Sequence, residues 1–483
     1  MINFVLMEIG KKQSYIFKSN KLKENIGASM IIKFVTEELP KNELSKNNGK
    51  KIIEGGGKSL YSFDNKESAK NFIKNISKEV ITKYPGLEIY FSTRECSLEK
   101  DNVVNEIDKL YKDLMTKKAK RINSINQQAL GIEKKCDSTG LPAVDVIKVR
   151  DEEGIVIEKR LVSSEIKSKI TMYEDNKKSY FKEEGAKFYE ELDNLISDEK
   201  SYIAIIHIDG NNMGNKFTQL SNLYKEKIEK DKSKNNEYLS EYSKLSKEID
   251  KAYKEAFKKV IENSKDEEGH SSIRPIIVAG DDITFIASAK DAIKLTKIFI
   301  DEINKKQICM GNKKIILNAA AGIAFIKSHY PFNRGYDLAE KLTANCKSVI
   351  KKNDEDASMI DWHVVQGEES DSISSIRKEH YKNGALELNL RPLYLNKKDQ
   401  LNSYENFKDA LKVIQNKEIS RSKIKGLRAE YKKGSQSVHI YMNYYGLNKY
   451  LDYVNGIQIK DGIYENKAVF YDAIELMDLV EEV

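Results

Sequence analysis

Two apolar runs of this chain each end in an acidic turn at a glycine, and this repeated feature constrains the fold more than any other. The first run, residues 202–208, leads into Asp209, and the second, residues 276–279, leads into Asp281 and Asp282 about 70 residues further along. An apolar run that ends at turn residues is typical of a buried strand. Carboxylates at the ends of central strands are costly unless cations pair with them. We therefore expect two neighbouring strands with the three aspartates gathered at their ends.

Three carboxylates in one place suit hard divalent cations. Mg²⁺ in phosphate chemistry is usually held by one or two carboxylates together with substrate oxygens, and two such ions can clamp the attacking and leaving oxygens of a phosphoryl transfer. A single Asp-Gly or Gly-Asp-Asp sequence would be an ordinary turn, but the two together favour a site. We predict that two Mg²⁺ or Mn²⁺ ions bind at Ile208, Asp209, Asp281 and Asp282, which indicates nucleotidyl transfer.

A short glycine-rich segment joins the first apolar run to the helix expected after it. Small residues let the backbone approach phosphate groups closely, and the free amides at a helix N-terminus can hold a phosphate. The segment would serve equally well as a tight strand-to-helix turn. Beside the aspartates, however, we predict that it binds a triphosphate together with the glycine of the second turn. The predicted phosphate-facing residues are Gly210, Asn211, Asn212, Met213, Gly214 and Gly280.

The same order of elements occurs twice along the chain. Residues 1–131 and 201–362 each show the pattern of a strand, a helical stretch, a glycine-centred hairpin, a helix and another strand. In the first half, Glu8 is the only acid near the end of the first strand, and glycines stand in the place of Gly280, Asp281 and Asp282. We therefore expect the first half to bind a nucleotide at most, without two metals. The glycines in question are Gly55, Gly56 and Gly57.

The remaining segments connect or extend these two halves. Residues 132–200 are predicted to be a connector with a hairpin and a helix, and residues 363–483 to be mainly short helices, with a strand at 386–395. Within the two halves we expect one helix near 13–37 and one strand at 315–326. The chain is thus expected to form two similar sheet-and-helix units, a connector and a C-terminal region.

Composition narrows the class of protein further. Charged residues make up 33% of the chain and hydrophobic residues 40%, no apolar run reaches the ~18 residues of a membrane span, and the first residues do not resemble a signal peptide. The four cysteines form no C-x-x-C pair, so we expect reduced thiols, a cytoplasmic location and no zinc. The net charge of +7 permits nucleic-acid contact without demanding it. We interpret the lysine- and glutamate-rich residues 220–255 as a solvated helical pair.

The motifs resemble those of a known family. The second half is similar to the GGDEF-type palm shared by nucleotide cyclases and the polymerase-like large subunit of type III CRISPR effector complexes, and the match to the latter is closer. The first half resembles that family's degenerate first palm. The resemblance rests on Asp209–Gly214, Ala279–Asp282, Ala321–Ala324 before Tyr330-Pro331, and Ala339-Glu340 before Cys346-Lys347 in the second half, and on Tyr15–Phe17, Asn20–Leu22, Gly27–Ser29 and Gly55–Gly57 in the first.

This resemblance implies a fold and an activity. The implied fold is α/β (α+β), with two ferredoxin-like palms in tandem packed face to face, a small connector at 132–200 and a helical C-terminal domain at 363–483. In the family, the second palm polymerises ATP into cyclic oligoadenylate messengers of antiviral defence. By this resemblance, Lys347 would contact the triphosphate and the first palm would hold the acceptor nucleotide.

The chain departs from the family in ways that leave alternatives open. It shows no N-terminal His-Asp nuclease motif, so DNA cleavage is not expected, and only Cys136 is present where relatives often have paired cysteines. These residues are compatible with three alternatives: a stand-alone relative, an RNA-binding scaffold subunit of a CRISPR complex, and a diguanylate-type cyclase that uses GTP. The partners considered are nucleoside triphosphates, RNA, proteins of a CRISPR complex and further copies of the chain. A membrane is not expected as a partner.

Overall fold

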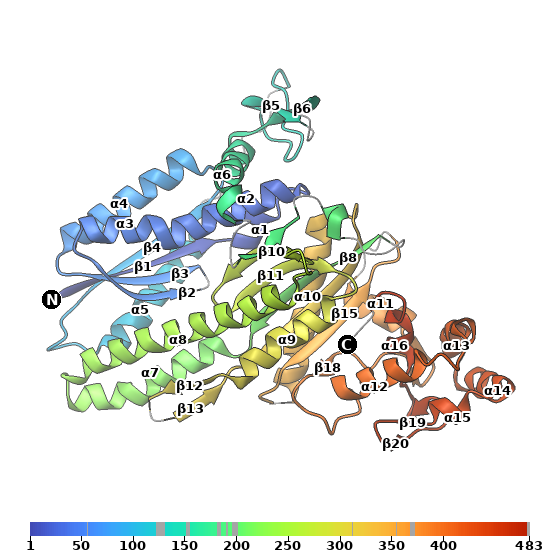
Figure 1. Ribbon diagram of the computed structural model, residues 1–483. Coiled ribbons are helices and arrows are strands. Elements are labelled where there is room, and N and C mark those ends of the chain that lie inside the picture. The colour runs from blue at the N-terminus through green and yellow to red at the C-terminus, as the bar shows by residue number, and fades with distance from the viewer. Residues whose placement is uncertain are drawn as a thin grey trace.

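A computed structural model shows two sheet-and-helix units, a connector and a C-terminal region (Figure 1). The structure describes residues 1–55, 57–121, 131–150, 155–180, 185–189, 192–195, 201–311, 313–353, 355–367 and 372–480. Gly56, one of the predicted site residues, therefore lies outside the described residues, as does the turn at 151–154. No helix among the described residues has both the length and the apolar character that crossing a membrane requires.

The first unit is a four-stranded antiparallel sheet with helices after its first and last strands and after its hairpin. The strand order β2-β3-β1-β4 is that of a ferredoxin-like unit, in which the first strand lies between the third and the fourth. Its strands are β1 (Ile2–Gly10), β2 (Lys50–Gly55), β3 (Lys58–Phe63) and β4 (Glu88–Cys96). Its helices are α1 (Lys12–Ile16), α2 (Leu22–Lys33), the π-helical turn η1 (Phe34–Glu38), α3 (Leu39–Lys46), α4 (Lys66–Lys83) and α5 (Val103–Ala119).

Local sequence signals explain where these helices begin and which face they bury. The side chain of Asn65 accepts a hydrogen bond from the Ser68 amide at the start of α4, and Asn102 caps α5 in the same way through Val104. In α4, the buried Phe72, Ile76 and Val80 recur every four residues, which is the spacing of one helical face. The expected single helix at 13–37 is wrong, because the chain leaves helical geometry between α1 and α2.

The second unit repeats this plan around a larger sheet with the strand order β10-β11-β8-β14-β15-β18. Strands β11, β8 and β14 are antiparallel neighbours, and β15 runs parallel to β14. Its strands are β8 (Tyr202–Gly210), β10 (Ile273–Ala279), β11 (Asp282–Ser288), β14 (Ala319–Lys327), β15 (Met359–Val364) and β18 (Leu393–Tyr394). Its helices are α7 (Met213–Lys230), α8 (Lys234–Asn263), α9 (Ala292–Lys305) and α10 (Phe332–Lys352).

Two expectations for this half need correction. The strand expected at 315–326 is two strands, because the chain turns at Leu317 and Asn318 between β14 and the short β13 (Lys313–Ile316), which pairs with β12 (Gln307–Met310). Residues 220–255 do form a helical pair, α7 and α8, but α8 is not merely solvated. One face of α8 is buried in the main core, including Tyr238, Tyr253 and Phe257.

The two units contact one another reciprocally. Helix α8 of the second unit packs on β2, an edge strand of the first sheet, and α2 of the first unit packs on β10, the equivalent edge strand of the second. Helix α5 contacts α7, and in the equivalent place Phe17, directly after α1, stacks on Tyr336 of α10 with ring centroids 3.8 Å apart. The same contacts thus occur twice with the units exchanged, as expected for a pseudo-two-fold arrangement of duplicated units.

The connector lies against the first unit. It contains the predicted hairpin, as β5 (Asp145–Arg150) and β6 (Val156–Val162), and the predicted helix, as α6 (Ser164–Tyr180). Helix α6 packs on α2, where Gly27 allows close approach: a Cβ on Gly27 would lie 1.9 Å from the carbonyl oxygen of Lys169. Cys136 is buried with Val162 and Ile166. The short elements β7 (Lys187–Phe188), η3 (Leu192–Leu195) and β9 (His270–Ser271) complete this region.

The C-terminal region is built from short helices and two-residue strands. The strand expected at 386–395 is instead two short strands, β17 and β18, and only β18 joins the large sheet. The helices are α11 (Ile373–His380), α12 (Tyr404–Ile414), α13 (Arg421–Lys433), α14 (Ser435–Tyr445), α15 (Asn448–Leu451) and α16 (Tyr471–Leu476). The other strands are β16 (Lys382–Asn383), β17 (Leu386–Glu387), β19 (Tyr453–Val454), β20 (Ile457–Gln458), β21 (Ile463–Tyr464) and β22 (Lys467–Ala468).

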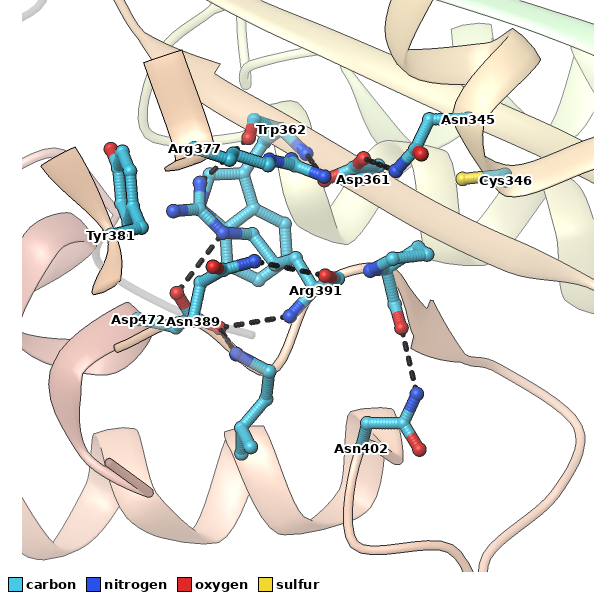
Figure 2. Close-up of polar contacts among 12 residues, drawn as sticks. Asn345, Cys346, Asp361, Trp362, Arg377, Tyr381, Asn389, Arg391, Asn402 and Asp472 are labelled. Carbon is cyan, nitrogen blue, oxygen red and sulfur yellow. Dashed lines mark hydrogen bonds and ion pairs between the residues drawn. The ribbon is translucent and has the colours of Figure 1, made fainter. Parts of the chain in front are cut away.

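A buried polar network fastens this region to the second unit (Figure 2). The guanidinium of Arg391 lies 3.0 Å from Asp472 and 2.8 Å from Glu475, donates a 2.6 Å hydrogen bond to the carbonyl of Trp362 on β15, and lies over the Trp362 ring. Burial alone would raise the pKa of Glu475, but the adjacent Arg391 and Arg428 lower it below its usual value. Arg391 therefore compensates carboxylates that would otherwise be buried as uncompensated charges.

Replacing Arg391 with alanine should strongly destabilise the protein. Removing one partner of a buried ion pair typically costs ~3–5 kcal/mol, because the other charge stays buried without compensation. Arg421→Ala is the matched control, since the Arg421 side chain is 66% exposed and pairs with Asp478 at the surface, where such a pair contributes only ~0–1 kcal/mol. Thermal unfolding of both variants measures the difference, and equal melting temperatures would contradict the structural role of Arg391.

Candidate active site

The acidic turn forms where β8 and β11 meet. Asp209 and Asp282 lie directly opposite one another in the antiparallel register of the two strands, and the Gly210 amide donates a 3.1 Å hydrogen bond to the carbonyl of Asp281. The hairpin between β10 and β11 turns at Gly280, whose φ of 61° is in the left-handed region that favours glycine. The structure thus brings Asp209, Asp281 and Asp282 together at one end of two central strands.

Negative charge is concentrated at this turn. Burial of Asp281, and then the charge of the neighbouring Asp209, raise the pKa of Asp281 to about 6. Tyr253 of α8 lies underneath, and burial together with Asp281 and Asp209 raises the pKa of its phenol well above the usual value. Burial is the largest cause of both shifts, and the charges of the neighbouring carboxylates add to it, so a further negative charge is unfavourable here.

Three basic side chains face the turn. The ammonium of Lys347 on α10 is ion-paired with Asp209 and donates a 3.0 Å hydrogen bond to the carbonyl of Gly210. Lys12 of α1 reaches across from the first unit, with its Nζ 3.7 Å from Asp282 Oδ2. His207 Nδ1 lies 3.7 Å from Asp282 Oδ1. The turn is therefore contacted from β8, from α10 and from the other unit.

The expected metal site is not preassembled. Among the described residues, no group of three or more His, Cys, Asp or Glu side chains is arranged to hold a metal ion. The Asp209 carboxylate is ion-paired with Lys347. The residues nevertheless fit such an ion chemically. Asp282 Oδ1 is buried and accepts no hydrogen bond from the described residues, and Asp281 already has a raised pKa. Carboxylate oxygens of this kind are the ligands that Mg²⁺ prefers.

The Gly210–Gly214 segment divides into buried and exposed residues. Asn211 is buried, its amide donating to the carbonyl of Asn318 and its side chain to that of Ala357, both at 2.8 Å. Met213 is also buried and begins α7, whereas Asn212, with a left-handed φ of 56°, and Gly214 are exposed. Asn211 and Met213 therefore hold the turn in place. The exposed amides at the start of α7 are the part of the segment that can face a phosphate.

The first unit carries an altered copy of this turn. Gly55 pairs with Lys58 as Ala279 pairs with Asp282, so the expected alignment of the glycines is wrong by one residue. Gly57 and Lys58 correspond to Asp281 and Asp282, and Glu8, opposite Lys58, corresponds to Asp209. Two of the three acids are therefore replaced, one of them by a lysine.

One ion pair is kept in both units. Lys118 of α5 donates a 3.0 Å hydrogen bond to Glu8, as Lys347 of the equivalent helix α10 does to Asp209. In the first unit Lys58 adds a second cation 3.5 Å from Glu8. The first turn thus has two lysines beside one carboxylate, whereas the second has three carboxylates beside two lysines and His207.

Lys12 lies between the two turns. A Cβ on Gly57, whose φ is +83°, would lie 2.7 Å from Cδ of Lys12, so the glycine makes room for this side chain, whose ammonium faces Asp282. The sequence pattern did not identify Lys12, Lys58, Lys118 or Tyr253. The succession Gly10-Lys11-Lys12 after an apolar strand was a signal for the first of these, but Tyr253 stands in a lysine-rich helix that shows no such signal.

Comparison with known proteins shows what this site is similar to. Two tandem ferredoxin-like units with an acidic turn in the second define a tandem palm protein. Residues 202–355 match the family model described as Cas10/Cmr2, second palm domain. This match and the structural similarity below confirm the resemblance to the large subunit of type III CRISPR effector complexes. The sequence matches none of the curated proteins.

Solved structures share the fold of almost the whole chain. Csm1 of T. onnurineus is similar with a TM-score of 0.59 at 12% identity, over 99% of this chain and 70% of that one. The Csm1-Csm4 cassette in complex with cA4 is similar with a TM-score of 0.56 at 11% identity, and the match covers 99% of this chain and 69% of that one. The same cassette in complex with one ATP also has a TM-score of 0.56, at 12% identity, and the match covers 99% of this chain and 70% of that one. This chain thus spans about 70% of the length of these relatives, and similarity at such identities establishes the fold.

Two glycines of the predicted site should respond differently to alanine. A Cβ on Gly210 would lie 2.5 Å from Tyr253 Oη and 2.9 Å from Asp281 Cβ, so Gly210→Ala should overpack the turn and cost ~1–3 kcal/mol of stability. A Cβ on Gly214 would meet no atom of the described residues within 4 Å, so Gly214→Ala should leave stability unchanged or raise it by up to ~1 kcal/mol. Melting temperatures test this pair, and equal effects would show that the turn is not closely packed.

Proposed function

We propose that this protein is a metal-dependent nucleotidyltransferase that converts ATP into a cyclic oligonucleotide, of the cyclic oligoadenylate type, as a messenger of antiviral defence. The observation that carries the proposal is the excess of carboxylates at the β8–β11 turn, since such a cluster is stable only with cations beside it. The similar structures were determined with ATP and with cA4, which agrees with nucleotides as substrate and product.

Each side chain of the turn has a distinct role in this proposal. Asp209, Asp281 and Asp282, with the adjacent Ile208, would hold two Mg²⁺ or Mn²⁺ ions. When bound, such ions lower the pKa of an attacking 3′-hydroxyl and neutralise the leaving pyrophosphate. Lys347, whose ammonium already lies at the turn, would contact the triphosphate, and the amides at the start of α7 would face its phosphates.

The first unit would hold the acceptor nucleotide. Lys12 contacts both turns, so the glycine turn of the first unit and the acidic turn of the second lie close to one another. Lys58 and Lys118 surround Glu8 with positive charge, which favours a phosphate rather than a metal ion. Two nucleotides held at facing turns would have the attacking hydroxyl of one near the α-phosphate of the other, and such positioning provides much of the rate enhancement in phosphoryl transfer.

Two other functions make different predictions. A diguanylate-type cyclase would prefer GTP, and a scaffold subunit would bind RNA without turning over any nucleotide. Incubation with each nucleoside triphosphate and Mg²⁺ or Mn²⁺, with the products identified by mass spectrometry, separates these cases. Other proteins of a CRISPR complex are the protein partners that the proposal includes, because several of the similar structures are Csm1-Csm4 assemblies.

Removing two acids of the turn should abolish product without unfolding the protein. We expect Asp281→Ala combined with Asp282→Ala to lower turnover by about 1,000-fold or more, because the loss of several kcal/mol of charge stabilisation corresponds to such a factor. The melting temperature should not fall, since the substitutions relieve repulsion with Asp209. Glu267→Ala with Glu268→Ala removes the same charge from an exposed turn of the same unit and should leave turnover unchanged.

Either of two results would count against the metal site. Unchanged turnover in the Asp281/Asp282 variant would show that these acids do not take part in catalysis. A large fall in its melting temperature would show that the turn is structural.

The product should be a cyclic species of at least two nucleotides joined through 3′-hydroxyls. We expect 3′-deoxy-ATP to bind but to stop chain growth, because it lacks the attacking group, while 2′-deoxy-ATP still reacts. Mass spectrometry of the products, together with a competition assay for binding, checks this expectation. Cyclic mononucleotide alone, or linear RNA alone, would contradict a reaction between nucleotides held at the two turns.

A further inference from the structure

Helix α14 carries three tyrosines that form an exposed aromatic cluster. Tyr444 is 80% exposed and Tyr445 is 39% exposed, and with Tyr441 they make up what we name the tyrosine cluster. The ring centroids of Tyr441 and Tyr445 are 4.7 Å apart, and those of Tyr444 and Tyr445 are 4.8 Å apart at an interplanar angle of 89°. Figure 1 places α14 at the far end of the molecule from the first sheet.

The cluster is built into the structure rather than loosely attached. Tyr441 Oη donates a 3.0 Å hydrogen bond to the carbonyl of Lys423 on α13, and a Cβ on Gly426 would lie 2.1 Å from that hydroxyl. The absence of a side chain at Gly426 therefore lets Tyr441 lie against α13. Within α14, Val438 and Met442 provide the buried contacts. The cluster is thus held on a supported helix whose outer face is exposed.

Lysine adjoins the cluster. The ammonium of Lys423 lies 5.1 Å from the centre of the Tyr445 ring, and no carboxylate among the described residues pairs with it. Residues 415–461 contain nine Lys and Arg against four Asp and Glu. Four of these cations are ion-paired: Arg421 and Lys425 with Asp478, Arg428 with Glu475, and Lys433 with Glu430. The surface therefore presents aromatic faces together with the unneutralised charge of Lys423.

We propose that the tyrosine cluster and the adjacent Lys423 bind single-stranded RNA. Unpaired bases stack on exposed aromatic rings, and Lys side chains neutralise the phosphates between them. The exposed Asn443 directly precedes Tyr444, and its amide both donates and accepts hydrogen bonds, as contact with a ribose 2′-hydroxyl requires. This proposal does not depend on the nucleotidyltransferase activity, because it involves a different surface.

The composition of the surface favours RNA over a protein partner. The exposed face of α14 combines the tyrosines with polar side chains such as Gln436, His439 and Asn443, and Ile440 is its one exposed aliphatic residue among those described. The apolar centre of a stable protein interface is depleted of charged residues, whereas here lysine adjoins the rings. A polyanion with flat bases matches both features.

Binding of a fluorescently labelled 20-nucleotide oligouridine to the full chain tests the proposal by fluorescence anisotropy. Tyr444→Ala should weaken binding about tenfold or more, while Tyr444→Phe, which keeps the ring, should bind as the unmodified protein does. Lys423→Ala should weaken binding and reduce its dependence on salt concentration. Tyr453→Ala removes a tyrosine that is 59% exposed outside the cluster and should have no effect. Equal melting temperatures should show that all variants are folded.

Several outcomes would overturn the proposal. The first is that the unmodified chain does not bind oligouridine, and the second is that Tyr444→Ala binds it as tightly as the unmodified chain. The third is that the chain binds duplex RNA as tightly as oligouridine, since paired bases cannot stack on the rings. Equal affinity for oligodeoxyuridine would overturn the assignment to RNA. A protein that binds the unmodified chain but not Tyr444→Ala, with no binding of oligouridine, would identify the cluster as a protein interface instead.

Discussion

The repulsion among three carboxylates at the β8–β11 turn is the constraint around which the rest of the site is arranged. Strand register sets Asp209 opposite Asp282, and the hydrogen bond from Gly210 to the carbonyl of Asp281 holds the third acid beside them. Burial, and then the charge of Asp209, raise the pKa of Asp281. Three basic side chains approach the turn: Lys347 from a helix, Lys12 from the other unit and His207 from β8. This arrangement supports the proposed binding of a cation and a polyanionic substrate at the turn.

Duplication gives this turn its setting. Both units place a lysine of the helix after the fourth strand against an acid of the first strand, as Lys118–Glu8 and Lys347–Asp209. The difference lies in the hairpin, where Gly57 and Lys58 stand in place of Asp281 and Asp282. Two substitutions in one turn thus change an excess of carboxylates into an excess of lysines while the fold stays the same. Because the units contact one another reciprocally, the two different turns face each other across Lys12.

The C-terminal region is connected to this site through packing and buried charge. Asp361 of β15 binds Asn345 of α10 and Arg377 of α11 (Figure 2). Asn345 lies two residues before Lys347 on the same helix. Arg391 extends the network to α16 through its ion pair with Asp472. The region that carries the tyrosine cluster is therefore fixed to the helix that positions Lys347. The similar structures share the fold over 99% of this chain at 11–12% identity, so the same fold forms from largely different residues.

Local signals in the sequence were enough to predict the order of strands and helices, the duplication and the grouping of Asp209, Asp281 and Asp282, because hydrophobic periodicity and turn residues act over a few neighbouring positions. They also indicated the resemblance to the large subunit of type III CRISPR complexes, which the match of residues 202–355 to a second palm domain confirms. Other features follow from tertiary contacts that no local pattern encodes. The alignment of Lys58 with Asp282 depends on strand register, and the approach of Lys12 and Tyr253 to the turn depends on packing between segments far apart in the chain. The boundaries of short elements, such as the break at Asn318, depend on the same contacts, because pairing between strands overrides local propensity.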